Sequence, residues 1–474
     1  MKTLIGWMTV LALGLFAMAQ ETPSVSEAVR LANQGKIREA IEAFEAIYQR
    51  APDNKTVLNW LGYLYLKAGK PAEAVPILEK AVQKTPNSAE AWNNLGNAYL
   101  HTGQLEKAIE AYKKTLALKP NSADAHYNIA NLYTKLKQYQ LAIQHYQQAI
   151  KLQPRDANAY NNLGYVYQMQ RLPRRAFEMY QKAVELEPNN TTFRYNYALA
   201  LAELGQYKEA AVELERVLSK TPGDPAGWLK LAECYARLKN PARAQQTLQR
   251  AIALHPNLPD LHYNLGILHL QQGNLQAAAS ALQNALNLRP DDADALAQLG
   301  YVYLRQKRLD DAIAALQTAL ERNPKLNDAR LNLATAKRLK GEKAEAMRLY
   351  QQVLAANPQQ FEARLALGDL LRETGDLKGA EAHYRAAIKL NDRSDIAWNN
   401  LGLVLLRTNR LNEAIQAFER AVSLNPKSPA ALNNLGAAYE RKGEIAKAKT
   451  FYRQALAIDP RFEEARANLK RLGE

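Results

Sequence analysis

The residues of this sequence with the clearest capacity for chemistry are its histidines and its single cysteine. The chain has 7 His and 1 Cys among 474 residues. His262 and His269 lie two turns apart if their segment is helical, and His126 and His145 can face each other if theirs forms a helical hairpin. Paired imidazoles can bind a metal ion or transfer a proton. These two pairs are therefore the candidates for a catalytic or metal site.

The surrounding sequence favours a structural interpretation of the same residues. His126, His262 and His269 stand at positions that belong to the packed face of a helix, so we interpret them as core substitutes. Cys234 is interpreted as a small buried hydrophobic residue, because equivalent positions elsewhere in the chain hold Leu64, Ala98, Val166 and Leu268. We find no glycine-rich phosphate loop, nucleophile elbow or cysteine pair. We expect a protein that is not an enzyme and has no cofactor, no metal site and no intramolecular disulfide.

A 34-residue period sets the positions of all these residues. Prolines recur on one register at 52, 86, 120, 154, 188, 222, 256, 290, 324, 358, 426 and 460, and Asp392 is the one departure. When this proline is numbered position 32, the first unit spans 21–54 and the last spans 429–462. Self-similarity at such a period indicates stacked repeats, which extend along one axis and do not surround a single core.

Each unit carries two amphipathic stripes. Position 20 is Ala in all thirteen units, and position 8 is Gly in eight units and Ala in five. Apolar residues at positions 4, 7, 8 and 11, and then at 17, 20, 24 and 27, follow the spacing of one helix face. Small residues at fixed positions indicate that two backbones approach closely. The pattern predicts two packed helices, A and B, in every unit.

Turn signals separate the two helices. Position 15 is Gly in eight units, including Gly69, Gly103 and Gly443, and glycine can adopt the left-handed conformation that ends a helix. The proline at position 32 ends helix B. Polar residues that follow it, such as Ser88, Ser122, Asp156 and Ser428, are placed to cap the next helix A.

This pattern resembles the tetratricopeptide repeat family, whose signature is W-x-x-L-G-x-x-Y, then A-x-x-x-F, then A, then P. The resemblance covers residues 21 to 462, and the clearest match is Trp92, Leu95, Gly96, Tyr99, Ala108, Tyr112 and Pro120. It departs from the signature at Glu27, in the first unit. The resemblance implies an all-α fold, a right-handed α-solenoid (superhelix) of thirteen 34-residue helix-turn-helix units. The concave side of such a solenoid is lined by the A helices.

The expected domain organisation follows from the register. The repeats are expected at 21–54, 55–88, 89–122, 123–156, 157–190, 191–224, 225–258, 259–292, 293–326, 327–360, 361–394, 395–428 and 429–462. They form one solenoid over 20–462, and residues 463–474 form a C-terminal capping helix. Polar end units are expected because a solenoid must close its exposed core.

Residues 1–19 read as a signal peptide. Lys2 supplies the positive start, the apolar core runs from Leu4 to Phe16, and Ala17-Met18-Ala19 fits the small-x-small cleavage rule. An uncleaved membrane anchor is the alternative, but thirteen apolar residues are short for a bilayer core that requires about 20. We expect export to the periplasm or the extracellular space, with no transmembrane segment after cleavage.

Positions 2, 5, 6, 9 and 13 of helix A form a stripe that the repeat pattern leaves uncovered. Position 6 is Asn in eight units, and a carboxamide can pair with a peptide backbone without reading its side chains. The run is similar to the asparagine ladder in the O-linked N-acetylglucosamine transferases, whose catalytic domain is missing here. The alternative is that Asn is simply common at this position. The eight residues are Asn94, Asn128, Asn162, Asn196, Asn264, Asn332, Asn400 and Asn434.

Aromatic and basic residues share the stripe. Exposed aromatic residues in a groove are typical of interface hot spots, although each can equally serve to cover a helix. The aromatic residues are Trp60, Tyr63, Tyr127, Tyr165, Tyr195, Tyr263 and Tyr301. Position 13 is basic in six units, which suits acidic peptides: Lys67, Lys135, Arg237, Arg305, Arg407 and Arg441.

These features predict a non-catalytic protein–protein interaction scaffold. It binds extended peptides or partner subunits on the concave helix-A surface, and we expect a role in bacterial cell-envelope assembly. Formal net charge is +15, so the alternative is a basic solenoid that binds an anionic polymer, either envelope glycan or nucleic acid. We expect neither a small-molecule substrate nor nucleic acid as the partner. We also expect that replacing Asn128 and Asn162 by Ala weakens ligand binding and leaves the melting temperature nearly unchanged.

Overall fold

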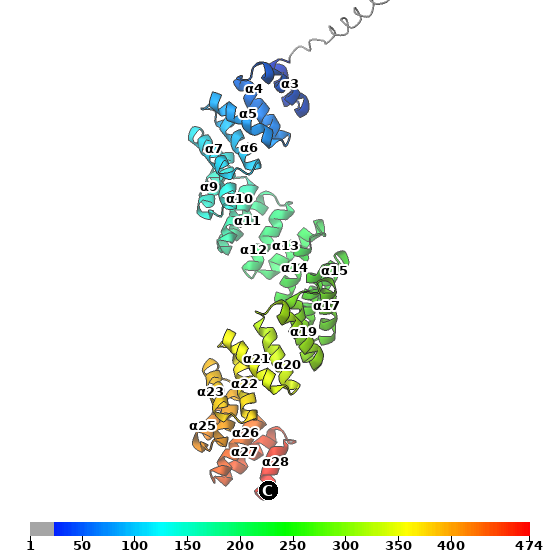
Figure 1. Cartoon of the computed structure of the whole chain (residues 1–474), viewed down its shortest axis with the longest axis vertical. Coiled ribbons are helices and arrows are strands. Elements are labelled where there is room, and N and C mark those ends of the chain that lie inside the picture. Colours follow the sequence, from blue (N-terminus) through cyan, green and yellow to red (C-terminus); the bar gives the residue numbers. More distant parts are fainter. Residues whose placement is uncertain (1–22) are drawn as a thin grey trace, which may run out of the picture. The chain divides into compact units, whose positions relative to one another are not determined.

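The computed structural model describes residues 23–474, and the predicted signal peptide lies outside the described residues. Within that range every regular element is an α-helix, and consecutive helices pair as hairpins (Figure 1). The predicted all-α class is confirmed. The chain divides into two compact units, one ending at Leu238 and the other beginning at Lys239, and each is described by itself.

The first unit contains α2 to α14. The even-numbered helices are the A helices of the repeats and the odd-numbered ones are the B helices. Their bounds are α2 Val25–Asn33, α3 Ile37–Arg50, α4 Lys55–Lys67, α5 Pro71–Lys84, α6 Ala89–His101, α7 Leu105–Leu118, α8 Ala123–Lys135, α9 Tyr139–Leu152, α10 Ala157–Met169, α11 Pro173–Leu186, α12 Thr191–Glu203, α13 Tyr207–Lys220 and α14 Pro225–Arg237.

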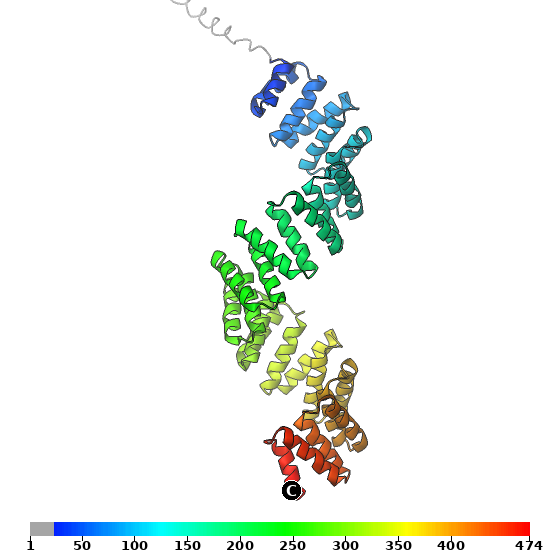
Figure 2. The same cartoon turned by 180° about the vertical axis from the view of Figure 1, so that it is seen from behind.

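The second unit contains α15 to α28, of which α28 occupies the segment expected to form the capping helix. The same alternation is visible from behind in Figure 2. The bounds are α15 Pro241–Leu254, α16 Pro259–Gln271, α17 Leu275–Leu288, α18 Ala293–Arg305, α19 Leu309–Arg322, α20 Asn327–Leu339, α21 Lys343–Ala356, α22 Phe361–Thr374, α23 Leu377–Leu390, α24 Asp395–Arg407, α25 Leu411–Leu424, α26 Pro429–Arg441, α27 Ile445–Ile458 and α28 Glu463–Arg471.

Small residues let the two helices of each hairpin approach closely. All thirteen alanines at position 20 are buried, with at most 1% exposure. Position 8 lies against the side chain at position 24 of the same unit. A Cβ added to Gly164 would lie 2.9 Å from ring atoms of Tyr180, which is itself only 1% exposed. Glycine at position 8 therefore makes room for the large residues that fill the core.

The predicted turns and caps are confirmed. Gly69 and Gly103 have φ of 71° and 77° and follow the A helices of their units. The Ser88 hydroxyl accepts the Ala91 N–H at 3.2 Å, and the Asp156 carboxylate accepts the Asn158 N–H at 3.0 Å. Five A–B turns instead place a non-glycine residue in the left-handed region, namely Lys137, Arg171, Lys239, Lys307 and Asn409.

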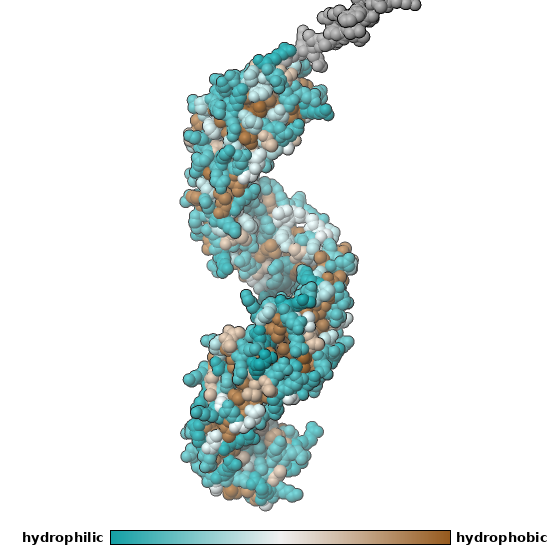
Figure 3. Space-filling view, in the orientation of Figure 1, coloured by the Kyte–Doolittle hydropathy of each residue, from teal (hydrophilic) through white to brown (hydrophobic). Residues whose placement is uncertain are grey.

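The surface of the described residues is mainly hydrophilic. Figure 3 shows polar side chains over most of the visible face, with apolar residues scattered between them. Among residues 23–474, none of the helices combines the length and the hydropathy that crossing a bilayer requires.

Candidate functional site

Five of the eight predicted asparagines donate to the A helix of the preceding repeat: Asn128, Asn162, Asn196, Asn400 and Asn434. Asn97 at position 9 accepts the Tyr112 hydroxyl from helix B of its own unit at 2.6 Å. The same Oδ1 accepts Nδ2 of Asn128, the position 6 residue of the next unit, at 3.3 Å. The three side chains form one network across α6, α7 and α8.

The network recurs in both units of the chain. In the next repeat, Asn131 accepts from the Tyr146 hydroxyl, and from Asn162 Nδ2 at 3.1 Å. In the second unit, Asp369 accepts from Tyr384 at 2.7 Å, and Asn400 Nδ2 donates to it at 2.9 Å. An acceptor at position 9, a tyrosine at position 24 and the next asparagine at position 6 therefore act together.

In the repeats that precede Asn196 and Asn434, position 9 holds neither Asn nor Asp, and an asparagine at position 5 is the acceptor. Asn196 Nδ2 donates to Asn161 Oδ1 at 2.8 Å, and Asn434 Nδ2 donates to Asn399 Oδ1 at 2.9 Å. The capping helix α28 continues the series, because Asn468 at its sixth residue donates to Asn433 at 3.0 Å. Amide hydrogen bonds thus link successive A helices in several repeats of both units.

These bonds correct the expectation that nothing in the chain covers the stripe. Asn94 is buried, at 7% exposure, and Asn128, Asn162, Asn196, Asn332, Asn400 and Asn434 are half-buried. Asn264 is exposed and donates to the Asp260 carbonyl of its own helix at 2.8 Å. A carboxamide has two N–H donors and a carbonyl oxygen with two lone pairs, so each bridging asparagine keeps part of its capacity for a ligand.

The aromatic residues of the stripe differ in exposure. Tyr165 is 45% exposed, whereas the other predicted aromatic residues are half-buried: Trp60, Tyr63, Tyr127, Tyr195, Tyr263 and Tyr301. Trp60 stacks on Phe44 at a centroid distance of 6.2 Å, so it belongs partly to the core. The hydroxyl of Tyr127 accepts Asn162 Nδ2 at 3.0 Å. Burial raises the pKa of both Tyr195 and Tyr263.

The basic residues at position 13 are all exposed: Lys67, Lys135, Arg237, Arg305, Arg407 and Arg441. Two of them lie over a tyrosine one turn earlier. Lys67 Nζ is 5.6 Å from the ring centre of Tyr63, and Arg305 donates to the Tyr301 hydroxyl at 3.0 Å. The end of helix A therefore presents cations beside aromatic rings, an arrangement suited to carboxylate ligands.

The histidines form one close pair. His126 and His145 face each other, with their Nδ1 atoms 3.0 Å apart. His126 Nε2 lies 3.3 Å from the Pro120 carbonyl, so it must donate there and its Nδ1 must accept from His145. Burial lowers the pKa of both rings, that of His145 to about 4 with help from His126 and Lys113. In the part of the chain that the structure describes, no three His, Cys, Asp or Glu side chains gather as metal ligands.

Position 4 has a structural role that the sequence reasoning missed. Its side-chain N–H donates to the backbone carbonyl six residues earlier, at position 32 of the preceding unit. Trp92 donates to the Pro86 carbonyl at 2.9 Å, and His262 pairs with the Pro256 carbonyl at 3.0 Å. The signal was present in the sequence, since Trp, Arg and His, which all carry ring or guanidinium N–H groups, recur there. His126 and His262 are therefore half-buried residues that bind a carbonyl and not apolar core substitutes.

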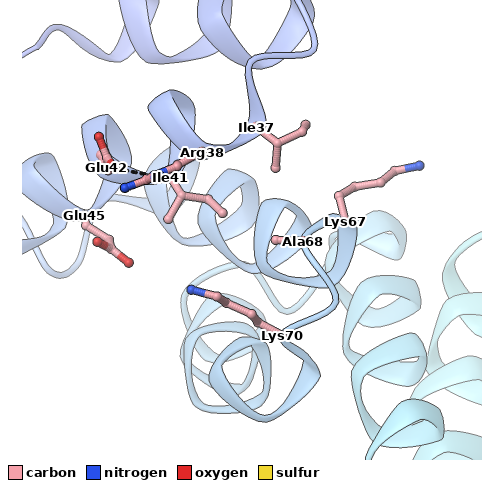
Figure 4. A pocket seen from close by; sticks show the side chains of 8 residues that line it. All are labelled: Ile37, Arg38, Ile41, Glu42, Glu45, Lys67, Ala68 and Lys70. Atoms are coloured by element: carbon pink, nitrogen blue, oxygen red, sulfur yellow. Dashed lines mark hydrogen bonds and ion pairs between the residues drawn. The ribbon is translucent and has the colours of Figure 1, made fainter.

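A cavity of about 680 Å³ lies at the N-terminal end of the first unit, between α3 and the end of α4 (Figure 4). Ile37 and Ile41 line it together with charged side chains. The Arg38 Nε–Glu42 pair measures 3.1 Å, and Glu45 accepts the Tyr65 hydroxyl at 2.6 Å. Its carboxylates thus already have partners, and we assign it no chemistry.

Cys234 is buried, as predicted, with 0% exposure. Burial raises the pKa of its thiol to about 11. A thiol of this kind is a poor nucleophile, because the reactive species is the thiolate.

Comparison with known proteins identifies the family. The model of the cilia and flagella-associated protein 70 C-terminal domain, a tetratricopeptide domain, matches residues 23–224 and 218–393, and the tetratricopeptide repeat model matches 365–429 and 399–461. The chain belongs to the tetratricopeptide repeat family. No curated protein matches it.

Several solved structures are similar to parts or most of the chain. MamA is 30% identical, with a TM-score of 0.33, over 34% of this chain and 94% of that chain. YrrB, described as a TPR protein with an unusual peptide-binding site, is 27% identical, with a TM-score of 0.36, over 38% of this chain and 92% of that chain. The Cut9–Hcn1 hetero-tetramer of the APC/C is 16% identical, with a TM-score of 0.44, over 94% of this chain and 95% of that chain.

Proposed function

We propose that the chain is a non-catalytic scaffold that binds extended peptides or partner subunits along its A helices. Membership of the tetratricopeptide repeat family supports a role in protein–protein interaction. The described residues offer side chains for binding but no assembled catalytic group. The close pair of imidazoles, His126 and His145, is used in an internal hydrogen bond.

The observation that carries this proposal is the regular row of carboxamides on successive A helices. Asn128, Asn162 and Asn196 each use an N–H to reach the preceding repeat. Asn128 and Asn196 each have a second N–H, whereas Asn162 donates to both Asn131 and Tyr127. Amide groups in such a row can pair with main-chain groups whatever the ligand's side chains. Neighbouring helices lie about 10 Å apart, which matches about three residues of an extended peptide at roughly 3.3 Å per residue.

The bridges also fix the binding surface before a ligand arrives. An asparagine held by the preceding repeat loses little side-chain entropy when it binds, and such preorganisation improves affinity. Exposed Tyr165 lies on α10 among these asparagines and supplies an apolar contact. The surface thus combines fixed polar groups with an aromatic anchor.

The proposed setting is the bacterial cell envelope. It is supported by the sequence of residues 1–19, whose basic start, apolar core and Ala-x-Ala end fit a cleaved export signal. A protein with a single cysteine can operate in an oxidising compartment without internal disulfides, since helix packing alone supports it.

Binding is tested with a random 15-residue peptide library selected on the full chain. Selected peptides are measured by fluorescence anisotropy against Tyr165→Ala and against Gln148→Ala, a matched change at an exposed position of α9. We expect Tyr165→Ala to weaken binding by roughly tenfold, as truncation of an aromatic hot spot does, and Gln148→Ala to leave it unchanged. A library that yields no ligand, or equal affinity for the two variants, would refute the proposal.

A further inference from the structure

Two neighbouring A–B turns of the first unit present a cluster of unpaired cations, here called the basic edge. One turn joins α8 to α9 and the other joins α10 to α11. All five cations are exposed, and in the part of the chain that the structure describes none of them forms an ion pair. They are Lys135, Lys137, Arg171, Arg174 and Arg175.

The basic edge is not neutralised from within its own segment. From residue 125 to residue 177 the only acidic residue is Asp156, and Glu178, one helical turn after Arg174 on α11, forms no ion pair among the described residues. The Asp156 carboxylate is engaged at the opposite end of the hairpins, where it caps α10 through the N–H groups of Asn158 and Ala159 at 3.0 and 3.2 Å. In the second unit, by contrast, Arg410 is paired with Glu381 at 2.8 Å.

The two turns lie side by side. They occupy the same place in adjacent repeats, and α8 and α10 are joined by bonds from Asn162 to Asn131 and Tyr127, at 3.1 and 3.0 Å. A ligand that crosses one turn can therefore reach the next, about 10 Å away.

Two of the cations occupy backbone positions that favour glycine. Lys137 and Arg171 have φ of 58° and 57°, in the left-handed region that is unfavourable for residues with a Cβ. Glycine fills this turn position in eight other repeats. Folding alone favours glycine here, so replacing the two side chains by glycine removes their charges without destabilising the turns.

Exposed apolar side chains lie on the same two hairpins. Leu141 is 38% exposed, Met169 43% and Leu172 37%. Leu172 is in the α10–α11 turn, and Leu141 is in the first turn of α9. Exposed Tyr165 lies one turn before Met169 on α10 and continues the apolar surface toward the asparagine row.

The mixture of charges and apolar groups decides the chemistry of the partner. Phosphates of a nucleic acid or carboxylates of a glycan satisfy cations, but neither polymer carries aliphatic side chains to pack against Leu141, Met169 and Leu172. Apolar side chains on an acidic peptide cover them and gain the free energy of buried apolar surface. We propose that the basic edge binds an acidic protein segment that also carries leucine-like side chains, an assignment that rests on the proposed peptide-binding function.

The test compares three fluorescein-labelled probes on the full chain by anisotropy. They are a 15-residue peptide of Glu and Leu, a 15-residue poly-Glu peptide and a 15-nucleotide single-stranded DNA. The variant Lys137→Gly/Arg171→Gly removes two cations and places glycine at two positions with left-handed backbone conformation. The matched control, Lys239→Gly/Lys307→Gly, makes the same change at two other left-handed lysines with φ of 54° and 60°.

The Glu-Leu peptide is expected to bind more tightly than the other two probes. Lys137→Gly/Arg171→Gly weakens it roughly tenfold, the upper part of the range for two exposed ion pairs. The same variant melts at or above the wild-type temperature, because glycine suits the turn. The control keeps wild-type affinity.

Tighter binding of DNA or poly-Glu than of the Glu-Leu peptide would overturn the inference, as would affinity that Lys137→Gly/Arg171→Gly leaves unchanged. If library-selected peptides still lose affinity with Tyr165→Ala while the basic edge has no effect, the inference fails and the proposed function stands. If neither change weakens any peptide, both fail.

Discussion

Replacing Asn97 by Leu tests whether the asparagine–tyrosine network stabilises the stack. Asn97 accepts from the Tyr112 hydroxyl at 2.6 Å and from Asn128 at 3.3 Å, and Tyr112 has 0% exposure. The substitution removes both hydrogen bonds. Loss of the bond from Asn128 costs about 1 kcal/mol, and leaving the buried Tyr112 hydroxyl without its acceptor costs a further 1 kcal/mol or more. We expect a loss of about 2 kcal/mol.

A second substitution should restore most of this loss. The chain itself pairs Leu403 at position 9 with Phe418 at position 24, so Leu with Phe is a combination that the repeat already accommodates. Because replacing both polar partners by apolar groups can be nearly neutral, Asn97→Leu/Tyr112→Phe should recover at least 1 kcal/mol relative to Asn97→Leu alone.

The assay must resolve single repeats, since a solenoid can unfold locally. Native-state hydrogen exchange of the α6–α8 amides, followed by mass spectrometry, reports the opening free energy there, and the α24–α26 amides serve as an internal control. The reasoning is wrong if Asn97→Leu leaves exchange unchanged, or if the second substitution adds to the loss.

Two other predictions concern titratable groups. Burial lowers the pKa of His145 to about 4, against about 6.5 in an unfolded chain. The unfolded chain therefore binds more protons below pH 6.5, and stability falls between pH 6.5 and 4, by about 1 kcal/mol at pH 5 for this partly exposed ring. Between pH 7.5 and pH 5 the melting temperature should fall further for the wild-type protein than for His145→Gln, and equal falls would contradict the prediction. Burial raises the pKa of the Cys234 thiol to about 11, so it should react with DTNB at pH 8 about a hundredfold more slowly in the native chain than in urea; equal rates would show an accessible thiolate.

The helices and turns could be predicted from the sequence because local signals determine them. Gly103 supplies the left-handed turn and Ser88 supplies the cap, and each acts within a few residues. The 34-residue register then places every A and B helix. Because hydrophobic spacing and turn chemistry agree in each unit, this level of structure follows from the sequence alone.

The role of the asparagines could not be read in the same way. An asparagine that waits for a ligand and one that bridges two helices look identical in sequence, and the acceptor for Asn128 is 31 residues earlier. A signal did exist, since Asn97, Asn131 and Asp369 each stand 15 residues before a tyrosine that donates to them.

The bridges also change one expectation. Replacing Asn128 and Asn162 by Ala was predicted to leave stability nearly unchanged, but it removes three inter-repeat bonds. We now expect a lower melting temperature together with weaker binding, so these residues cannot separate the two effects. Exposed Tyr165 can.

Site-specific photocrosslinking tests the central claim most directly. Benzophenone-alanine is placed at residue 165 on the A-helix surface or at the exposed position 148 on helix B, and the full chain is irradiated in the cells that produce it. We predict that residue 165 forms adducts with peptide segments of partner proteins, mapped by mass spectrometry, and that residue 148 does not. Adducts confined to residue 148, or none at residue 165, would contradict a binding surface along the A helices.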